Sequence, residues 1–184
     1  MRLALIAHPS FPNESGSRIY VDAERSPSDT LKLHYFLEEK IENLIVAPVR
    51  ASRRTDALWQ HTCFEAFLRI VPGTAYYEFN LSPSTEWAAY RFTGYRTGMA
   101  AANILPPRID VQASEGRLEL SAQLDLTGLA GIVPDGEWQI ALSAVIEASG
   151  GNKSYWALKH PAGKPDFHHA DGFACRLAPS QAEA

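Results

Sequence analysis

The sequence predicts an all-β fold, an antiparallel β-sandwich of the jelly-roll type. Apolar and polar residues alternate with a period of two along much of the chain, whereas helical periodicity is nearly absent. Turn-forming residues separate the short runs, as at Pro72-Gly73, Ser82-Pro83-Ser84 and Gly150-Gly151. Many short strands at this spacing are typical of sandwiches, in which each turn returns the chain to a neighbouring strand.

The alternation predicts each strand in turn, and a helical turn is the alternative for the short segment Glu38–Glu42. The predicted strands are Arg2–Ala7, Arg18–Ala23, Leu31–Leu37, Leu44–Val46, Thr62–Val71, Tyr76–Leu81, Glu86–Phe92, Ile109–Ala113, Arg117–Leu124, Trp138–Ala148, Ser154–Leu158 and Phe173–Leu177. The length of 184 residues fits one domain, which we place at 1–178, followed by a short flexible tail at 179–184.

The composition narrows the classes of partner. Hydrophobic residues make up 46% of the chain and charged residues 21%, which is typical of a globular domain. The net charge of −4 gives no support to a nucleic-acid partner, because phosphate binding relies on clustered Lys and Arg. No apolar stretch reaches the roughly 18 residues of a membrane helix, and the first residues lack the features of a signal peptide. We therefore expect no membrane partner and a cytoplasmic protein.

The two cysteines, Cys63 and Cys175, both lie in apolar, strand-like runs. A free cysteine in such a run packs as a small hydrophobe, so buried, reduced thiols are the favoured interpretation. A lone disulfide and a reactive thiol are the alternatives.

Three consecutive predicted strands place polar and aromatic groups opposite their apolar faces. In "LWQHTCFEAFL", Trp59, His61, Cys63 and Glu65 alternate with apolar residues. The next strand puts Tyr76, Glu78 and Asn80 on one face, and the third opposes Trp87, Ala89 and Arg91 to Ala88, Tyr90 and Phe92.

If these strands are neighbours, the groups on their polar faces lie a few cross-strand spacings apart. An indole packs on the C–H face of a sugar ring, and carboxylate, amide and guanidinium groups bond its hydroxyls. The faces therefore indicate a saccharide site that includes Trp59, Glu65, Glu78, Asn80 and Arg91. The alternative is an ordinary solvated face, with an ion pair between Glu65 and Arg91 and with Trp59 at the sheet edge.

Three segments carry a resemblance to a known group: "LWQHTCFEAFL", "YYEFNLSPSTEWAAYRF" and "PDFHHADGFACRL". They resemble the family 9 carbohydrate-binding modules and the wider DOMON-like superfamily, especially its small stand-alone bacterial members. The resemblance runs from about Trp59 to Leu177 and implies a jelly-roll sandwich. It also implies a terminal sugar held between two tryptophans, with help from a Glu, an Arg and amides.

By position in these motifs, Trp59 matches the first tryptophan and Glu65 the carboxylate six residues later. Trp156 is the candidate for the second tryptophan, and Asn152 for an accompanying amide. Arg91 is the candidate arginine, with Arg96 nearly as good. The chain departs from the pattern at Gln60-His61-Thr62, where relatives often carry acidic residues.

Two alternative functions stay open at this point. Other members of the superfamily bind haem through Met and His, so a haem- or redox-associated domain that uses Met99 is the first alternative. No c-type haem attachment motif is present. The second is a protein-interaction or homodimerising domain, since exposed Trp and Tyr also anchor interfaces.

A cluster near the C-terminus, "HPAGKPDFHHADGF", raises the question of a metal site, with Asp166, His168 and Asp171 as weak candidates. Adjacent histidines on an extended chain point to opposite sides, and standard zinc spacings are missing. The favoured interpretation is therefore structural, with an Asp bonded to turn amides, and we expect no cofactor.

The chain shows no nucleophile elbow, P-loop, dinucleotide fingerprint or His-Glu-x-x-His helix. Glu65 and Glu78 are candidates for a carboxylate pair of the glycosidase kind, since they face the same side of neighbouring predicted strands, but carboxylates on a sheet are usually solvated or salt-bridged. The sequence thus favours a non-catalytic binding module whose partner is a small molecule.

Overall fold

The computed structural model describes residues 1–11, 13, 16–132 and 136–178, and the predicted tail at 179–184 lies outside this part of the chain. The strands are β1 (Arg2–Ala7), β2 (Arg18–Arg25), β3 (Thr30–Glu38), β4 (Cys63–Ile70), β5 (Tyr76–Leu81), β6 (Trp87–Phe92), β7 (Ala100–Ala101), β8 (Arg108–Ser114), β9 (Arg117–Asp125), β10 (Trp138–Glu147), β11 (Lys153–Ala157) and β12 (Cys175–Leu177). Three 3-10 turns accompany them: η1 (Ile41–Asn43), η2 (Leu58–Gln60) and η3 (Ala170–Gly172).

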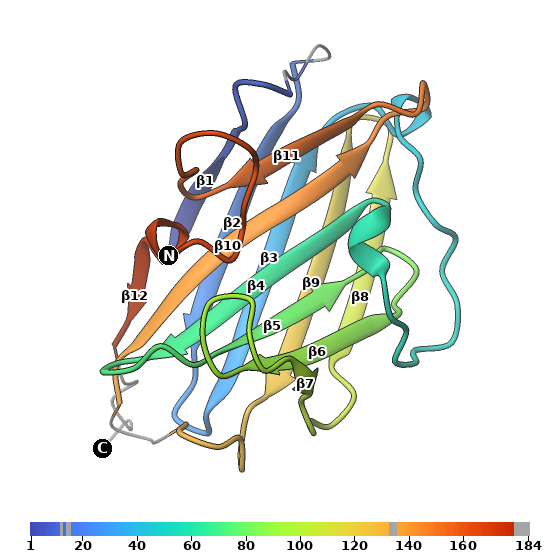
Figure 1. Cartoon of the computed structure of the whole chain (residues 1–184). Coiled ribbons are helices and arrows are strands. Elements are labelled where there is room, and N and C mark those ends of the chain that lie inside the picture. The colour runs from blue at the N-terminus through green and yellow to red at the C-terminus, as the bar shows by residue number, and fades with distance from the viewer. Residues whose placement is uncertain (12, 14–15, 133–135, 179–184) are drawn as a thin grey trace.

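The strands form two antiparallel layers that pack face to face (Figure 1). The back layer has the order β1-β2-β3-β9-β8, and the front layer has the order β7-β6-β5-β4-β10-β11. Strand β1 joins the layers, because Arg2–Leu5 pairs with β2 and Ile6–Ala7 pairs with β11. Strand β12 pairs with the first residues of β10, on the side where β11 pairs with the later ones.

The main core lies between the two layers. Tyr35 of β3 is fully buried, and its hydroxyl donates a hydrogen bond of 2.8 Å to the backbone oxygen of Glu65 on β4. Its ring also contacts that of Phe64, with the ring centroids 4.9 Å apart. Inward-facing residues of both layers complete this core, as the alternation of the strands predicts.

A second apolar cluster lies on the outer face of the front layer. It consists of the buried residues Phe67, Tyr76, Phe92, Ala141 and Phe173. The rings of Tyr76 and Phe92 stack with their centroids 4.8 Å apart. The front layer is therefore apolar on both faces over part of its area.

The predicted all-β, antiparallel sandwich is confirmed, whereas the jelly-roll designation stays a prediction. A 3-10 turn is present at Ile41–Asn43, so it shares only Ile41 and Glu42 with the predicted helical turn at Glu38–Glu42, whose first residue ends β3. The strand predicted at Leu44–Val46 is wrong: Leu44 makes an isolated bridge to Ala148 at the end of β10 and the Ile45 N–H bonds the Glu147 oxygen, but no ladder of paired residues follows. The short strand β7 was missed, since two exposed alanines carry no alternation.

Both cysteines, Cys63 and Cys175, are free and buried, in agreement with the favoured interpretation. Burial raises the pKa of each thiol, most strongly at Cys63. Within the described ranges, no helix has the length and apolar character needed to span a membrane.

Candidate ligand-binding site

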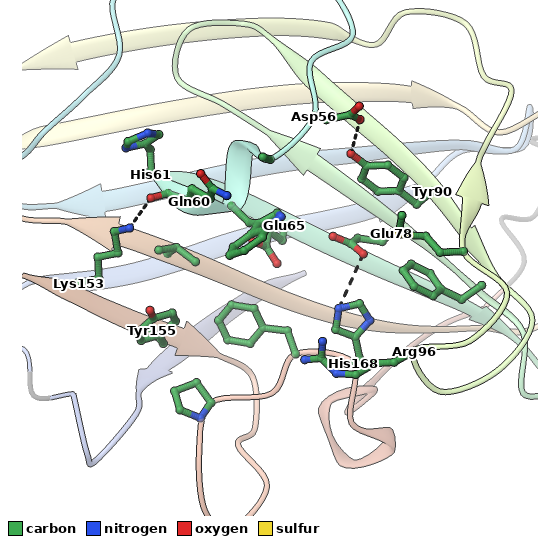
Figure 2. Close-up of a pocket in the computed structure, with 17 residues that line it drawn as sticks. Asp56, Gln60, His61, Glu65, Glu78, Tyr90, Arg96, Lys153, Tyr155 and His168 are labelled. Carbon is green, nitrogen blue, oxygen red and sulfur yellow. Dashed lines mark hydrogen bonds and ion pairs between the residues drawn. The ribbon is translucent and has the colours of Figure 1, made fainter.

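A cavity of about 980 Å³ opens on the outer face of the front layer (Figure 2). Its floor comes from β4, β5, β6, β10 and β11, and its walls come from the chain before β4, the loop after β6 and the loop before η3. The lining residues are Asp56, Ala57, Trp59, Gln60, His61, Glu65, Glu78, Tyr90, Phe92, Arg96, Met99, Val145, Lys153, Tyr155, Pro165, Phe167 and His168.

The first wall is the turn that precedes β4. Ala57 has a φ of 61°, in the left-handed region, and so turns the chain into η2, which carries Trp59. The Tyr90 hydroxyl donates a 2.6 Å hydrogen bond to Asp56, and the Lys153 ammonium donates one to the backbone oxygen of Gln60 (Figure 2). Two strands of the floor thus hold this wall, and the Trp59 side chain keeps 53% of its surface exposed.

The other two walls are tied together by Asp166. Its carboxylate accepts hydrogen bonds from the Tyr95 hydroxyl at 2.5 Å and the Arg96 guanidinium at 2.8 Å, and from the backbone N–H of His168 at 3.1 Å. Burial opposes the charge of Asp166, but the bonds from Tyr95 and Arg96 hold its pKa below the usual value. The ion pair therefore fixes the loop after β6 against the C-terminal loop.

His168 points from the C-terminal loop into the cavity (Figure 2). Its Nδ1 lies 2.8 Å from the hydroxyl of Tyr76, which already accepts a 3.2 Å bond from the backbone N–H of Arg96. We assign the hydroxyl proton to the bond with Nδ1, which leaves Nε2 protonated and directed at the Glu78 carboxyl 3.8 Å away. Burial lowers the pKa of His168 to about 4, so the ring is neutral at pH 7.

Two carboxyl groups lie on the cavity floor. Glu65 of β4 is 3% exposed and Glu78 of β5 is 6% exposed, and Glu78 accepts a 2.8 Å hydrogen bond from the amide of Asn80. Burial and the neighbouring Glu78 raise the pKa of Glu65 well above its usual value. Burial also raises the pKa of Glu78, although the Asn80 bond opposes the shift. The floor is thus a low-dielectric surface on which charge is costly.

The structure brings together some of the predicted site residues. Trp59, Glu65 and Glu78 all line the cavity, and Asn80, fully buried beside Glu78 on the same face of β5, donates a hydrogen bond to the Glu78 carboxyl. The alternation of Trp59 with Glu65 had placed Trp59 on a strand. In the structure, Trp59 lies on a 3-10 turn instead. Asn152 is exposed in the turn between β10 and β11 and does not line the cavity.

The placement of Trp156 as the second stacking ring is wrong. Trp156 is 4% exposed and packs in the core between the layers, where its indole N–H donates to the Ser154 hydroxyl at 2.9 Å. Successive side chains of a strand point to opposite faces, so the preceding residue, Tyr155, is the one that lines the cavity. The two indoles therefore do not face each other.

The prediction for Arg91 is also wrong, for the same geometric reason. Trp87 and Ala89 pack in the main core, so Arg91 lies on that side of β6 and is exposed at its end. Tyr90 and Phe92, which we had assigned to the core, line the cavity instead. The guanidinium of the site belongs to Arg96, the alternative arginine.

The candidate metal ligands do not converge. Asp166 bonds Arg96 and Tyr95, whereas the Asp171 carboxylate lies 3.8 Å from the Lys159 ammonium. Over the described residues, no three His, Cys, Asp or Glu side chains form a group suited to a metal ion. The bond from the His168 N–H to Asp166 matches the structural interpretation of this cluster. Met99, the candidate haem ligand, lies at the cavity with 64% of its surface exposed.

Sequence reasoning missed several lining residues, among them Tyr90, Lys153, Tyr155 and Phe167. Strict alternation signals two of them, because Tyr90 and Tyr155 are each one position before a residue that was chosen instead. Phe167 belongs to a loop, whose course over the sheet no local pattern reveals.

The fold and the cavity define the class of this chain: an antiparallel β-sandwich with a ligand-sized hollow on the outer face of one layer. It matches no family model and no curated protein sequence. Among the solved structures that share its fold are three with identities between 10% and 12%.

The first is a candidate carbohydrate-binding protein from Bacteroides uniformis, with a TM-score of 0.63 at 12% identity, over 97% of this chain and 85% of that one. The second is a family 9 carbohydrate-binding module from Caldicellulosiruptor kristjanssonii in complex with glucose, with a TM-score of 0.59 at 10% identity, over 93% and 81%. A family 9 module from the same organism in complex with cellotriose gives 0.54 at 11% identity, over 88% and 75%. The fold is thus shared, and the DOMON-like designation stays a prediction.

Proposed function

We propose that this chain is a non-catalytic module that binds a small saccharide, or a similar polyhydroxylated ligand, in the cavity of the front layer. The observation that carries the proposal is the exposed indole of Trp59 beside a floor of buried polar groups. A volume of about 980 Å³ lies at the upper end of ordinary ligand pockets, which span roughly 300–1,000 Å³. The fold shared with glucose- and cellotriose-bound modules supports the same ligand class.

In this proposal, the face of Trp59 packs on the C–H face of a sugar ring. Tyr155 and Phe167 supply further aromatic surface, in place of the second tryptophan. Arg96, His168 and the floor carboxyls bond the hydroxyls. One stacked ring and a few hydrogen bonds must offset the lost freedom of the ligand, so we expect a Kd of about 1 µM to 1 mM.

The state of the two floor carboxyls supports a binding role rather than hydrolysis. A glycosidase of the common kind needs one ionised carboxylate and one acid on either side of the scissile bond. Here both groups are buried and both have raised pKa values, and Glu78 is held by Asn80. Neither is suited to act as an exposed, ionised nucleophile.

The test is a calorimetric titration with glucose, cellotriose and a panel of other saccharides. We expect Trp59→Ala to weaken binding at least tenfold while the unfolding midpoint changes little, since the side chain is 53% exposed. Leu105→Ala is the matched control, because Leu105 is 66% exposed and does not line the cavity. Equal affinities of wild type and Trp59→Ala for every bound sugar would refute the assignment.

A further inference from the structure

Glu65 occupies an unusual position on the cavity floor. It lies on β4, in the interior of the front layer, directly opposite Asn80 of β5 and Ser143 of β10. Its side chain is 3% exposed and lines the cavity, yet its Oε1 atom has no hydrogen-bond partner among the described residues. A buried carboxyl group on a cavity floor with an unpartnered oxygen calls for an explanation, because nearly all buried polar atoms of native proteins have a hydrogen-bond partner.

The charged groups around Glu65 do not compensate an ionised carboxylate. Glu78 of β5 is a second acid, whose charge raises the pKa of Glu65 further, and Cys63 and Tyr35 are neutral groups whose own pKa values are raised by burial and by Glu65. Across the cavity, the Arg96 guanidinium is bonded to Asp166 and the Lys153 ammonium to the Gln60 oxygen. His168 is neutral at pH 7.

The floor also offers few donors: the buried Ser143 hydroxyl, opposite Glu65, favours the ionised carboxylate, but burial and Glu78 outweigh it and the pKa of Glu65 stays raised. The Asn80 side-chain oxygen is fully buried and has no partner in the described part of the chain, while the Asn80 nitrogen is used by Glu78. An ionised Glu65 would add only acceptors to this floor, whereas a protonated one adds an O–H donor. Burial of an unpaired carboxylate is unfavourable, and protonation of the carboxylate removes this penalty.

We propose that Glu65 serves this site as an uncharged carboxylic acid, which donates a hydrogen bond to an oxygen of the ligand. This inference rests on the proposed function and deepens it, because it determines which ligand groups the floor accepts. A neutral floor presents a donor and a carbonyl acceptor, as an amide does, and so selects uncharged hydroxyl, ring or carbonyl oxygens. It offers no negative charge to an amine, so cationic amino sugars should bind no more tightly than their neutral counterparts.

The first experiment compares the affinity of wild type with that of Glu65→Gln and Glu65→Leu for the tightest saccharide of the panel. Glutamine keeps a donor and an acceptor, so we expect its affinity to stay within about threefold of wild type. Leucine keeps neither, and we expect at least a tenfold loss. We also expect the wild-type affinity to fall as the pH rises through the pKa of Glu65, whereas the Glu65→Gln affinity stays constant.

Two outcomes of this titration overturn the proposal. A tenfold loss in Glu65→Gln, together with wild-type binding that strengthens as the pH rises, means that the carboxylate is the binding form. Wild-type affinity in both variants means that Glu65 does not contact the ligand.

The second experiment needs no ligand, and it separates failure of the inference from failure of the proposed function. A folded-state pKa above the unfolded value of about 4.3 means that the native state holds the proton over the interval between them. Stability in this interval falls as the pH rises. We expect the unfolding equilibrium constant of wild type, relative to Glu65→Gln, to rise by up to tenfold per pH unit above about pH 4.3.

Urea denaturation at a series of pH values measures this ratio. The same comparison in a Glu78→Gln background assigns the slope to Glu65 rather than to the coupled pair. A ratio that is constant, or that falls as the pH rises, overturns the uncharged state whether or not any saccharide binds.

Discussion

Residues 155 and 156 of β11 offer a direct test of the site geometry, because they are neighbours that point to opposite faces. Trp156 is 4% exposed in the main core, whereas Tyr155 lines the cavity and contacts Phe11 edge to face, with the ring centroids 4.9 Å apart. The resemblance assigned ligand stacking to Trp156, and the structure offers Tyr155 for that role instead. Alanine substitutions at the two positions therefore have opposite expected effects on stability and binding.

Removal of a buried indole costs both its transfer free energy and the cavity that it leaves, typically about 3–5 kcal/mol. At roughly 2–4 °C per kcal/mol for a chain of this size, Trp156→Ala should lower the Tm by about 6–20 °C. Tyr155 is only half-buried, so Tyr155→Ala should cost about 1 kcal/mol of stability. Because the ligand would lose its contact with the Tyr155 ring, Tyr155→Ala should weaken saccharide binding about tenfold.

Thermal unfolding followed by circular dichroism measures the first quantity, and calorimetric titration below the transition measures the second. Trp156→Phe accompanies Trp156→Ala so that a folded variant is available for the titration. The reasoning is refuted if Trp156→Ala keeps the wild-type Tm and loses binding while Tyr155→Ala binds normally.

Three further predictions concern the cavity walls. Gly98 has a φ of +62°, and an added Cβ would lie 2.2 Å from the Thr93 hydroxyl oxygen. Gly98→Ala should therefore displace the loop after β6 and lower the ligand affinity measured by calorimetric titration. Gly116→Ala, which has open space around the added Cβ, should leave this affinity unchanged. Arg96→Gln should weaken binding by about tenfold with a stability change below about 1 kcal/mol, and Arg91→Gln, outside the cavity, should leave the same titration unchanged. Because burial lowers the pKa of His168 to about 4, the unfolded chain binds a proton at His168 at a higher pH than the native chain does. Urea denaturation should therefore show that wild type loses stability relative to His168→Gln as the pH falls from about 6.5 to 4. Identical pH profiles of the two proteins would contradict the neutral ring.

The local pattern of the sequence determined the strands and their antiparallel arrangement. Each predicted strand of five residues or more has a counterpart in the structure, because period-two alternation and turn residues act over a few positions of the chain. The motif around Trp59 and Glu65 also contains two residues that line one cavity. Alternation sufficed to select them, because Trp59 and Glu65 are the aromatic and acidic members of one polar face of the predicted strand.

Which face of an individual strand packs against the core depended on tertiary structure. Alternation divides a strand into two faces, but it names the core face only when the other face is polar. Strand β6 is apolar on both faces, because the C-terminal loop covers Phe92 from outside while Trp87 packs between the layers. In β11, Tyr155 and Trp156 are both aromatic, so the sequence could not decide between them.

The cavity walls likewise depended on contacts between residues that are distant in the chain. Arg96 and Asp166 are separated by 70 positions, and Tyr76 and His168 by 92, yet each pair is joined by a hydrogen bond of 2.8 Å. The sequence by itself determined that this chain forms a β-sandwich and that Trp59 and Glu65 belong to one polar region. Only the packing of two loops against the front layer decided which other side chains surround that region, because burial and long-range pairing are properties of the folded chain as a whole.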